Sequence, residues 1–507
     1  MLESFRLLQT AGGFEREDQP SGQTDPQDAL QKVEFSKKPI GLAERPWVSV
    51  VIGKNGVGKS RLLAGITDIF ETLDRGKRRR RKGGYRVSRL AFVSDDHLCE
   101  IETDNAYRLS AKIDGRQCEL GDLPLPTKVI ALTTTPFDKF RISRSLSTMS
   151  GKEEYDVPER YVYLGLRDRS GRASPTAAIF RAIEGLFEAS GSEAERRLRI
   201  SEVFEFLDFK PHVVVRYEFS ASNMQRLEQI IAGEPLENVL KPRSPGTSRR
   251  PLERMLEREP MLLDEIRSIG MEVLHHADRA RTFSLRADFD SFSADHTFFK
   301  RVQILRRADL LRMRAAEVER VSDGAVLDLK LASSGELGIA TGFLGLASVI
   351  EDGSLIFIDE PEISLHPEWQ VRYIDLLLRT FGNYKGCHFV LATHSPLILS
   401  DITPEHSDVI SLDPYRPEAK EAKDFAGKSF DYLLVAAFQV PSKNNLYLKQ
   451  EVIKALRLAA DGKSETDEFT NVMDGLVSLL PKFEEGSPVA KLIQELQTAS
   501  EVSTGGS

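Results

Sequence analysis

Gly53-Lys-Asn-Gly-Val-Gly-Lys-Ser60 matches the phosphate-loop pattern GxxxxGK[ST]. An apolar, β-branched run over 46–52 precedes this segment, and a helix-periodic stretch over 61–73 follows it, which predicts a strand, a glycine-rich loop and a helix. Glycines let backbone N–H groups turn toward phosphate, and the helix start adds its positive end. We therefore expect ATP here, with the Lys59 amine at the β- and γ-phosphates and the Ser60 hydroxyl on Mg²⁺. The candidate nucleotide-binding residues of this loop are Gly53, Asn55, Gly56, Gly58, Lys59, Ser60 and Arg61.

A second segment, Ser354–Pro361, is an apolar run that ends in two carboxylates, Asp359 and Glu360. Nucleotides bind at the carboxyl edge of parallel sheets, so Asp359 is a candidate Mg²⁺ ligand. Glu360 is the candidate general base, a catalytic residue that would polarise the attacking water. Taken alone, the segment could also be a strand that ends in acidic turn residues.

A third segment, Ala332-Ser-Ser-Gly-Glu336, lies 26 residues before Asp359, counted from Ser333. Small hydroxyl and glycine residues at a helix start form an anion site, and this chain already has a phosphate loop. The implied ligand is the γ-phosphate of an ATP bound by a second copy. Ser333 and Glu336 also fit a capping box, and the two interpretations are compatible.

The fourth segment, Val390–Pro396, is another apolar run that ends in polar residues. His394 could hydrogen-bond the γ-phosphate, and we take it as a second candidate catalytic residue. A lone histidine is more often structural, but this one completes a set of four segments in a consistent chain order.

Together the four segments resemble the ATP-binding-cassette (ABC) ATPases of the SMC, RecF and OLD type. The resemblance implies an α/β P-loop NTPase fold of the ABC-ATPase type, in which a mixed β-sheet has flanking helices. It also implies hydrolysis of ATP to ADP and phosphate by a homodimer or a higher even oligomer. In such a pair each site joins one subunit's phosphate loop to the other's signature, which maps onto Ser333, Ser334, Gly335 and Glu336. Ala332 stands where a leucine is commoner, and Glu360–Pro367 resembles the EPExxLHP variant of OLD-like ATPases.

Three further segments are similar to the PtuA-type ATPases of the Septu and retron antiphage systems. They are TTPFDKF (134–140), YVYLGLRD (161–168) and SFDYLLVAAF (429–438). This resemblance implies a separately encoded HNH nuclease partner and, in a retron, a reverse transcriptase with its multicopy single-stranded DNA or RNA. The alternatives are a RecF- or SMC-like repair ATPase acting directly on DNA, and a scaffold that binds ATP with little turnover. TTPFDKF stands where the family's Q-loop is expected, yet it contains no glutamine.

The four segments divide the chain into an interrupted ATPase core and two additions. We expect the core over 1–140 and 313–400, a mainly helical insert over 141–312, and a helical C-terminal region over 401–507 whose tail is disordered. No acidic DxD cluster follows residue 400, so we expect no nuclease site there.

Composition and charge restrict the partners of the chain. Of 507 residues, 41% are hydrophobic, and the formal charge is −8. No run reaches the roughly 20 apolar residues of a membrane helix, and three scattered cysteines fit a reducing compartment, so we expect a cytoplasmic protein.

Seven basic residues lie within 75–82, and like charges at this density repel unless an anion neutralises them. We expect nucleic-acid contact at Lys77, Arg78, Arg79, Arg80, Arg81 and Lys82. A second basic cluster, between Lys300 and Arg314, is a weaker candidate.

Overall fold

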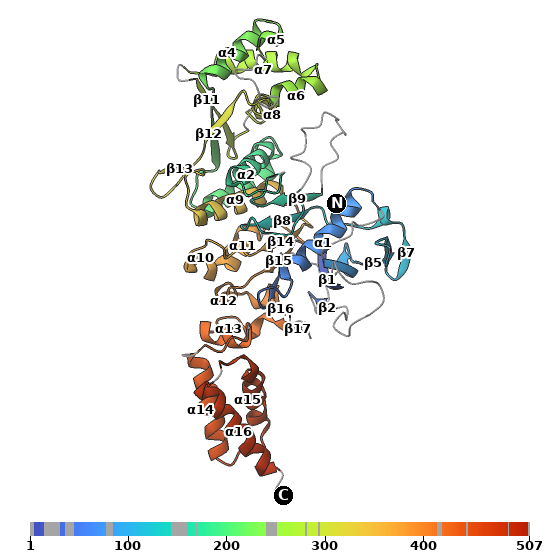
Figure 1. Ribbon diagram of the computed structural model, residues 1–507, viewed down its shortest axis with the longest axis vertical. Helices are drawn as coiled ribbons and strands as arrows, with labels where there is room; N and C mark the ends of the chain where they lie inside the picture. The colour runs from blue at the N-terminus through green and yellow to red at the C-terminus, as the bar shows by residue number, and fades with distance from the viewer. Residues whose placement is uncertain are drawn as a thin grey trace.

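A computed structural model shows the chain built around a parallel sheet (Figure 1). The structure describes residues 5–14, 31–35, 45–77, 85–142, 160–168, 170–239, 251–278, 281–292, 295–412, 418–442, 445–484 and 486–504.

The central sheet has seven strands in the order β17-β16-β3-β15-β14-β8-β9. Neighbouring strands are parallel from β16 to β9, and β17 adds an antiparallel edge. Every residue of the four adjacent strands β3, β15, β14 and β8 is buried, as expected for a parallel sheet covered on both faces. The strands are β3 (Trp47–Ile52), β8 (Val129–Thr133), β9 (Tyr161–Leu164), β14 (Leu355–Asp359), β15 (His388–Ala392), β16 (Ser407–Ser411) and β17 (Glu418–Glu421). With the phosphate loop after β3 and the strand of Asp359 two places away, the fold is that of a P-loop NTPase of the ABC type.

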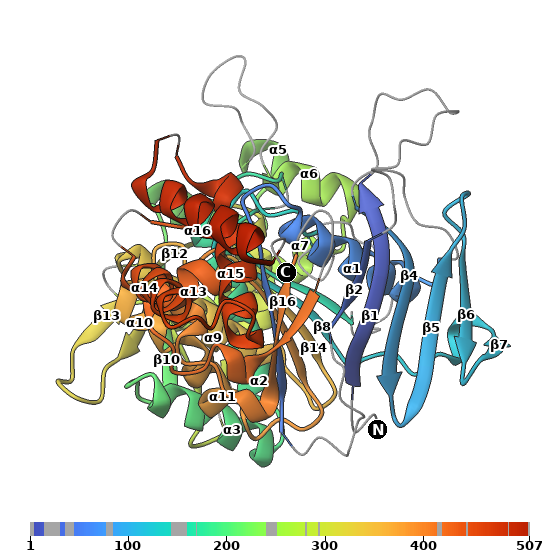
Figure 2. The ribbon, with the colours of Figure 1, turned by 90° about the horizontal axis from the view of Figure 1, so that it is seen from below.

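One face of the sheet is covered by helix α1 (Lys59–Asp74) and an antiparallel sheet of six strands. Val51 of β3 packs in this layer with Phe70 of α1 and Phe92 of β4 (Tyr85–Ser94), whereas Val50 packs on the opposite face. Figure 2 shows the six-stranded sheet standing beside the core. Its order is β2-β1-β4-β5-β6-β7, with β1 (Phe5–Phe14), β2 (Gln31–Glu34), β4 (Tyr85–Ser94), β5 (His97–Thr103), β6 (Leu109–Ile113) and β7 (Arg116–Cys118).

The opposite face is covered by helices, among which α9 (Ser334–Val349) and α2 (Pro175–Ser190) pack most closely. A Cβ on Gly345 would lie 3.5 Å from the Cβ of Ala182, so the two helix backbones approach each other at this point. The other helices of this layer are α3 (Ala194–Phe206), α10 (Pro367–Val371), α11 (Tyr373–Phe381) and α12 (Pro396–Leu399). The helix that begins at the signature is therefore packed directly on the first helix of the insert.

The insert contains a four-stranded sheet in addition to its helices. Its order is β11-β10-β12-β13, with β10 (His212–Glu218), β11 (Thr282–Asp288), β12 (Arg312–Glu319) and β13 (Val326–Asp328). Helices α4 (Ala221–Ile231), α5 (Leu236–Val239), α6 (Pro251–Arg258), α7 (Leu262–His276) and α8 (Asp295–Arg307) lie next to it, at one end of the molecule (Figure 1). This sheet corrects two expectations.

The insert was expected to be mainly helical, but it also contains the strands β10 and β11. Strands β12 and β13 belong to the same sheet, whereas the expected boundary at 313 assigns them to the ATPase core. Short strands whose partners lie about 70–100 residues away carry little local signal.

The C-terminal region ends in a cluster of three helices with its own small core. These are α14 (Leu446–Ala460), α15 (Asp467–Ser478) and α16 (Pro488–Thr504), and α13 (Phe430–Ala436) leads into them. Strands β16 and β17, which belong to the central sheet, precede them, so the region after 400 is not wholly helical. Helix α16 continues to Thr504, into the tail that we expected to be disordered. Across the described ranges, no helix is both long and apolar enough to cross a bilayer.

Candidate nucleotide site

The phosphate loop lies at the carboxyl end of β3 and runs into α1. Gly58 precedes the helix with a φ of 104°, a conformation that residues with a Cβ rarely adopt. Gly53 approaches the chain so closely that a Cβ there would lie 2.8 Å from the carbonyl oxygen of Leu412. Asn55 and Gly56 of the loop are exposed, as is Arg61 in the first turn of α1.

Lys59 lies under this loop and is 3% exposed. Its Nζ donates to the carbonyl oxygen of Gly53 at 2.8 Å and lies 3.0 Å from Nδ1 of His394. Burial lowers the pKa of Lys59 to about 8, against the attraction of Glu362, Glu360 and Asp359, in that order. Burial, followed by the charge of Lys59, lowers the pKa of His394 to about 4. His394 is therefore neutral at pH 7, and its Nδ1 accepts a hydrogen bond from the lysine.

Ser60 and Asp359, which are 299 residues apart, meet at the candidate metal position. The Ser60 hydroxyl donates to Oδ1 of Asp359 at 3.0 Å, while Oδ2 is buried and has no hydrogen-bond partner among the described residues. Burial raises the pKa of Asp359 to about 7, with a further contribution from Glu360. An orphaned carboxylate oxygen beside a hydroxyl fits a hard cation such as Mg²⁺. No cluster of three or more potential metal-ligating side chains occurs in the part of the chain that the structure describes. Mg²⁺ commonly binds through one carboxylate together with phosphates, so the donor set fits the ion.

Glu360 follows Asp359 in a backbone conformation unusual for its type, with a φ of 50°. Its Oε1 lies 3.8 Å from Nε2 of His394, so the two candidate catalytic side chains are neighbours. The main-chain N–H of Glu360 donates to the carbonyl oxygen of Ala392 at 2.9 Å, and its carbonyl oxygen accepts from the Thr134 hydroxyl at 3.0 Å. The structure therefore brings together Lys59, Ser60, Asp359, Glu360 and His394 from three separate strand ends.

Glu362, which lies in the EPExxLHP segment, has a role that the sequence pattern does not indicate: it contacts the main chain at His394. Its Oε1 accepts from the His394 main-chain N–H at 2.6 Å, and its Oε2 accepts from the Thr393 hydroxyl at 2.9 Å. Burial raises the pKa of Glu362. Gln370 also holds the segment that follows β15, because its side-chain oxygen accepts a hydrogen bond from the Ser395 hydroxyl at 2.7 Å. The spacing Glu360-Pro-Glu362 was the only sequence signal for this residue.

The signature residues lie at the start of α9. The Ser333 hydroxyl accepts from the Glu336 N–H at 3.3 Å, and Oε2 of Glu336 accepts from the Ser333 N–H at 3.1 Å, which confirms the capping box. The Ser333 hydroxyl also donates to Oε2 of Glu336 at 2.7 Å, and this bond, followed by the one from the Ser333 N–H, lowers the pKa of Glu336. Ser334 is exposed, and Gly335 is packed so closely that a Cβ would lie 2.8 Å from the carbonyl oxygen of Ser364. The phosphate-binding role of this segment stays a prediction.

The basic run is described only as far as Lys77, which is exposed just after α1. Arg78, Arg79, Arg80, Arg81 and Lys82 lie outside the described residues. In the second cluster, Arg301 pairs with Glu272 at 2.7 Å and Lys300 with Glu188 at 3.3 Å. Arg306 stacks 3.6 Å above the ring of Phe180. Because these cations already have partners, the second cluster is not an unpaired basic surface.

Comparison with known proteins gives partial matches. Residues 164–400 match a family model described as an AAA domain, a putative AbiEii toxin of a type IV toxin–antitoxin system. The curated "Retron Vc95 probable ATPase" of Vibrio cholerae serotype O1 biovar El Tor is 40% identical over 62 residues, which is 12% of each chain.

Solved structures with similar folds include the SMC head domain from Thermotoga maritima, which is 11% identical with a TM-score of 0.34 and covers 82% of this chain and 98% of that chain. A structure of the recombination mediator RecF is 11% identical with a TM-score of 0.30, and the match covers 82% of this chain and 99% of that one. Because these TM-scores are below 0.5, the fold assignment rests on the sheet order and the phosphate loop of the chain itself.

Proposed function

We propose that this protein binds ATP with Mg²⁺ and hydrolyses it as an ABC-type ATPase. The observation that carries the proposal is the Ser60–Asp359 hydrogen bond, which leaves one buried carboxylate oxygen without a partner. Ser60 and Asp359 would hold Mg²⁺, which neutralises charge on the β- and γ-phosphates. Lys59 would bind the same phosphates, and Glu360 would accept a proton from the water that attacks the γ-phosphorus as ADP leaves.

The position of the signature supports a complex of two heads. Ser334 is exposed at the start of a 16-residue helix, and its own chain already supplies a phosphate loop. A second copy would place its ATP against this helix start, where N–H groups favour an anion. Each ATP would then be held between two copies of the chain.

We further propose that the ATPase regulates a separately encoded nuclease in antiphage defence. The support is the short match to a retron ATPase and the toxin–antitoxin description of the matched family model. The TTPFDKF and YVYLGLRD segments add to it through their resemblance to PtuA-type ATPases, and Asp138 of the first pairs with Arg167 of the second. An HNH nuclease, and in a retron a reverse transcriptase with its nucleic acid, are the partners this proposal implies.

ATP turnover by the wild-type protein and by Glu360→Gln tests the enzymatic part. We expect Glu360→Gln to lower turnover by roughly 10²–10⁴-fold, since a general base contributes about that much. Binding of ATP should persist, and the trapped nucleotide should increase the dimer fraction in light scattering. A wild-type protein without turnover, or a variant as active as the wild type, would contradict the catalytic assignment.

Copurification with the products of neighbouring genes, followed by nucleic-acid extraction, tests the partner part. We expect a nuclease, and a nucleic acid if the system is a retron. If DNA alone stimulates turnover and no partner copurifies, the chain would act directly on DNA as a repair ATPase instead.

A further inference from the structure

The loop of residues 133–142, which we call the β8 loop, begins at the end of β8, beside the strand that carries the candidate base. Thr133 ends β8 in register with Asp359 of β14, so the next residues of the two strands, Thr134 and Glu360, leave the sheet side by side. The Thr134 hydroxyl donates to the Glu360 carbonyl oxygen at 3.0 Å. The β8 loop therefore contacts the candidate base through one side chain.

Glu360 needs such contacts because its left-handed backbone is unfavourable for a residue with a Cβ. Three hydrogen bonds fix its peptide groups. Two are between main-chain atoms, from Glu360 N–H to the Ala392 carbonyl and from Ile363 N–H to the Glu360 carbonyl at 3.2 Å. The third comes from the Thr134 side chain, and it is the one that a substitution removes without altering the backbone.

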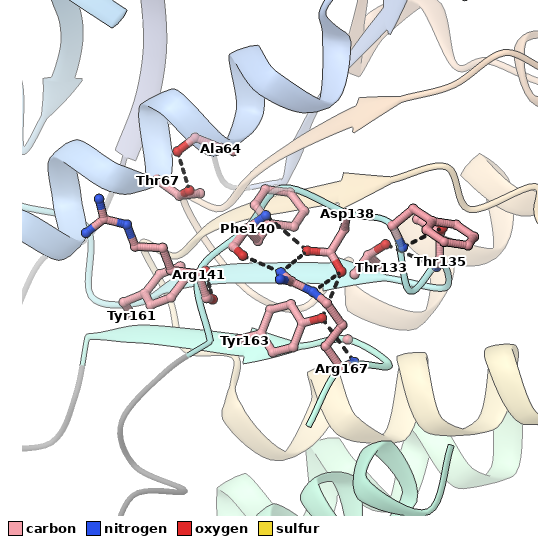
Figure 3. A network of polar contacts seen from close by, with 12 residues as sticks. Ala64, Thr67, Thr133, Thr135, Asp138, Phe140, Arg141, Tyr161, Tyr163 and Arg167 are labelled. Atoms are coloured by element: carbon pink, nitrogen blue, oxygen red, sulfur yellow. Dashed lines mark hydrogen bonds and ion pairs between the residues drawn. The ribbon is translucent and has the colours of Figure 1, made fainter. Parts of the chain in front are cut away.

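A buried ion pair holds the β8 loop in place (Figure 3). The Asp138 carboxylate is fully buried and accepts from the Tyr163 hydroxyl at 2.8 Å and from Nε of Arg167 at 3.0 Å. It also accepts from the Phe140 N–H at 3.0 Å. Arg167 also donates a hydrogen bond to the Phe140 carbonyl oxygen. The main-chain N–H and carbonyl of Phe140 are therefore both held, the first by Asp138 and the second by Arg167.

The far end of the β8 loop is attached to the helix of the phosphate loop. Nη1 of Arg141 lies 3.0 Å from Oε2 of Glu71, and the same guanidinium pairs with Asp68, one turn earlier on α1. The Tyr161 hydroxyl donates to the Arg141 carbonyl oxygen at 2.6 Å. The loop therefore spans from the candidate base to the helix that begins at Lys59.

The segment after β9, which carries Arg167, is attached to helix α2 of the insert. Arg181 of α2 donates to the carbonyl oxygen of Arg167 at 2.9 Å and to that of Gly165. Helix α2 in turn packs against α9, whose first turn is the signature. A shift of the insert against the core would therefore reach Glu360 through Arg167, Asp138 and Thr134.

We propose that Thr134 is a positioning residue for Glu360, and that the Asp138–Arg167 pair fixes the β8 loop so that the insert and α1 together set the geometry of the base. The proposal rests on the proposed ATPase function. Thr134 touches neither phosphate nor water in this scheme, and it acts only through the main chain of Glu360.

Steady-state ATP turnover of Thr134→Val, measured beside the wild type, tests the proposal. Valine keeps the shape of threonine and removes the hydroxyl. We expect kcat to fall by roughly 10- to 100-fold, the loss that a small misplacement of a catalytic group causes, while KM for ATP changes less than about twofold. Thr134→Ser restores the hydroxyl and should return kcat to within about threefold of the wild type. Thr341→Val is the matched control, since the Thr341 hydroxyl also donates to a main-chain carbonyl, that of Leu337, but within a helix.

The possible results separate this inference from the proposed function. Full activity of Thr134→Val in the presence of an active wild type would overturn the positioning role and leave the ATPase assignment standing. A raised KM and a lowered melting temperature, shared by the Val and Ser variants, would make Thr134 purely structural and also overturn it. A wild-type protein without turnover would overturn both proposals together.

Discussion

Nζ of Lys59 and Nδ1 of His394 lie 3.0 Å apart, and Nε2 of the same imidazole lies 3.8 Å from the carboxylate of Glu360. One neutral histidine thus stands between the lysine of the phosphate loop and the candidate base. Glu362 accepts a hydrogen bond from the main-chain N–H of His394, so Lys59, Glu360 and Glu362 all contact this histidine.

His394→Ala is the first prediction from this arrangement. We expect ATP turnover to fall by about 10²-fold, comparable with the removal of one preorganised donor to developing charge. ATP binding should change little, since Lys59 and the loop remain. His366→Ala is the control, because His366 is an exposed histidine at the start of α10. Equal turnover of both variants would exclude His394 from the reaction.

Asp138→Asn tests the buried pair through stability. The change leaves Arg167 without its charged partner, so we expect the free energy of unfolding to fall by about 3–5 kcal/mol in urea denaturation. Asp375→Asn removes the half-buried partner of Arg379, which is itself exposed, and should cost less than about 1 kcal/mol. Similar losses for the two variants would show that the Asp138 pair contributes no more than a surface ion pair.

His388 predicts a pH dependence of stability. Its Nδ1 accepts from the Leu7 N–H at 3.0 Å, and its Nε2 lies 2.9 Å from the Ser49 hydroxyl, so the neutral ring joins β15 to β1 and β3. Burial holds the pKa of His388 well below its ordinary value. The unfolded chain therefore binds the proton first, and stability that is present above pH 6.5 is lost as the pH falls below it, by up to about 1.4 kcal/mol per unit.

Urea denaturation between pH 5 and pH 8 checks this prediction. His388→Gln should be less stable than the wild type at pH 8, because the glutamine replaces both contacts imperfectly. Its stability should also fall less steeply below pH 6.5. Parallel curves for the two proteins would mean that His388 does not titrate in this range.

Ser333 and Ser334 separate the two roles of the signature segment. Ser333→Ala removes the cap of α9 and should lower the free energy of unfolding by about 1 kcal/mol. Ser334→Ala should leave stability within about 0.5 kcal/mol, since Ser334 makes no capping bond, but it should weaken ATP-dependent dimerisation. The effect on dimerisation is measured by sedimentation in the presence of ATP, with the Ser334→Ala change introduced into the Glu360→Gln protein. An unchanged dimer fraction would leave the segment as a helix cap alone.

Local sequence patterns were sufficient for the phosphate loop and for the strand that ends at Asp359. In both cases an apolar run, a special loop and their order along the chain carry the information within about ten residues. The capping box at Ser333 was predictable for the same reason, because its two partners lie three residues apart.

Other features depend on contacts between distant residues, which periodicity does not record. Asp138 and Arg167 are 29 residues apart, and Glu362 and His394 are 32 apart, yet each pair meets at a sheet edge. The strands β10 and β11 acquire partners only when the insert folds back on itself. Residue order and local periodicity thus indicated the phosphate loop and the two carboxylates. Long-range strand pairing and burial determined which residues contact and position these groups, because only the folded sheet brings separate strand ends to a single edge.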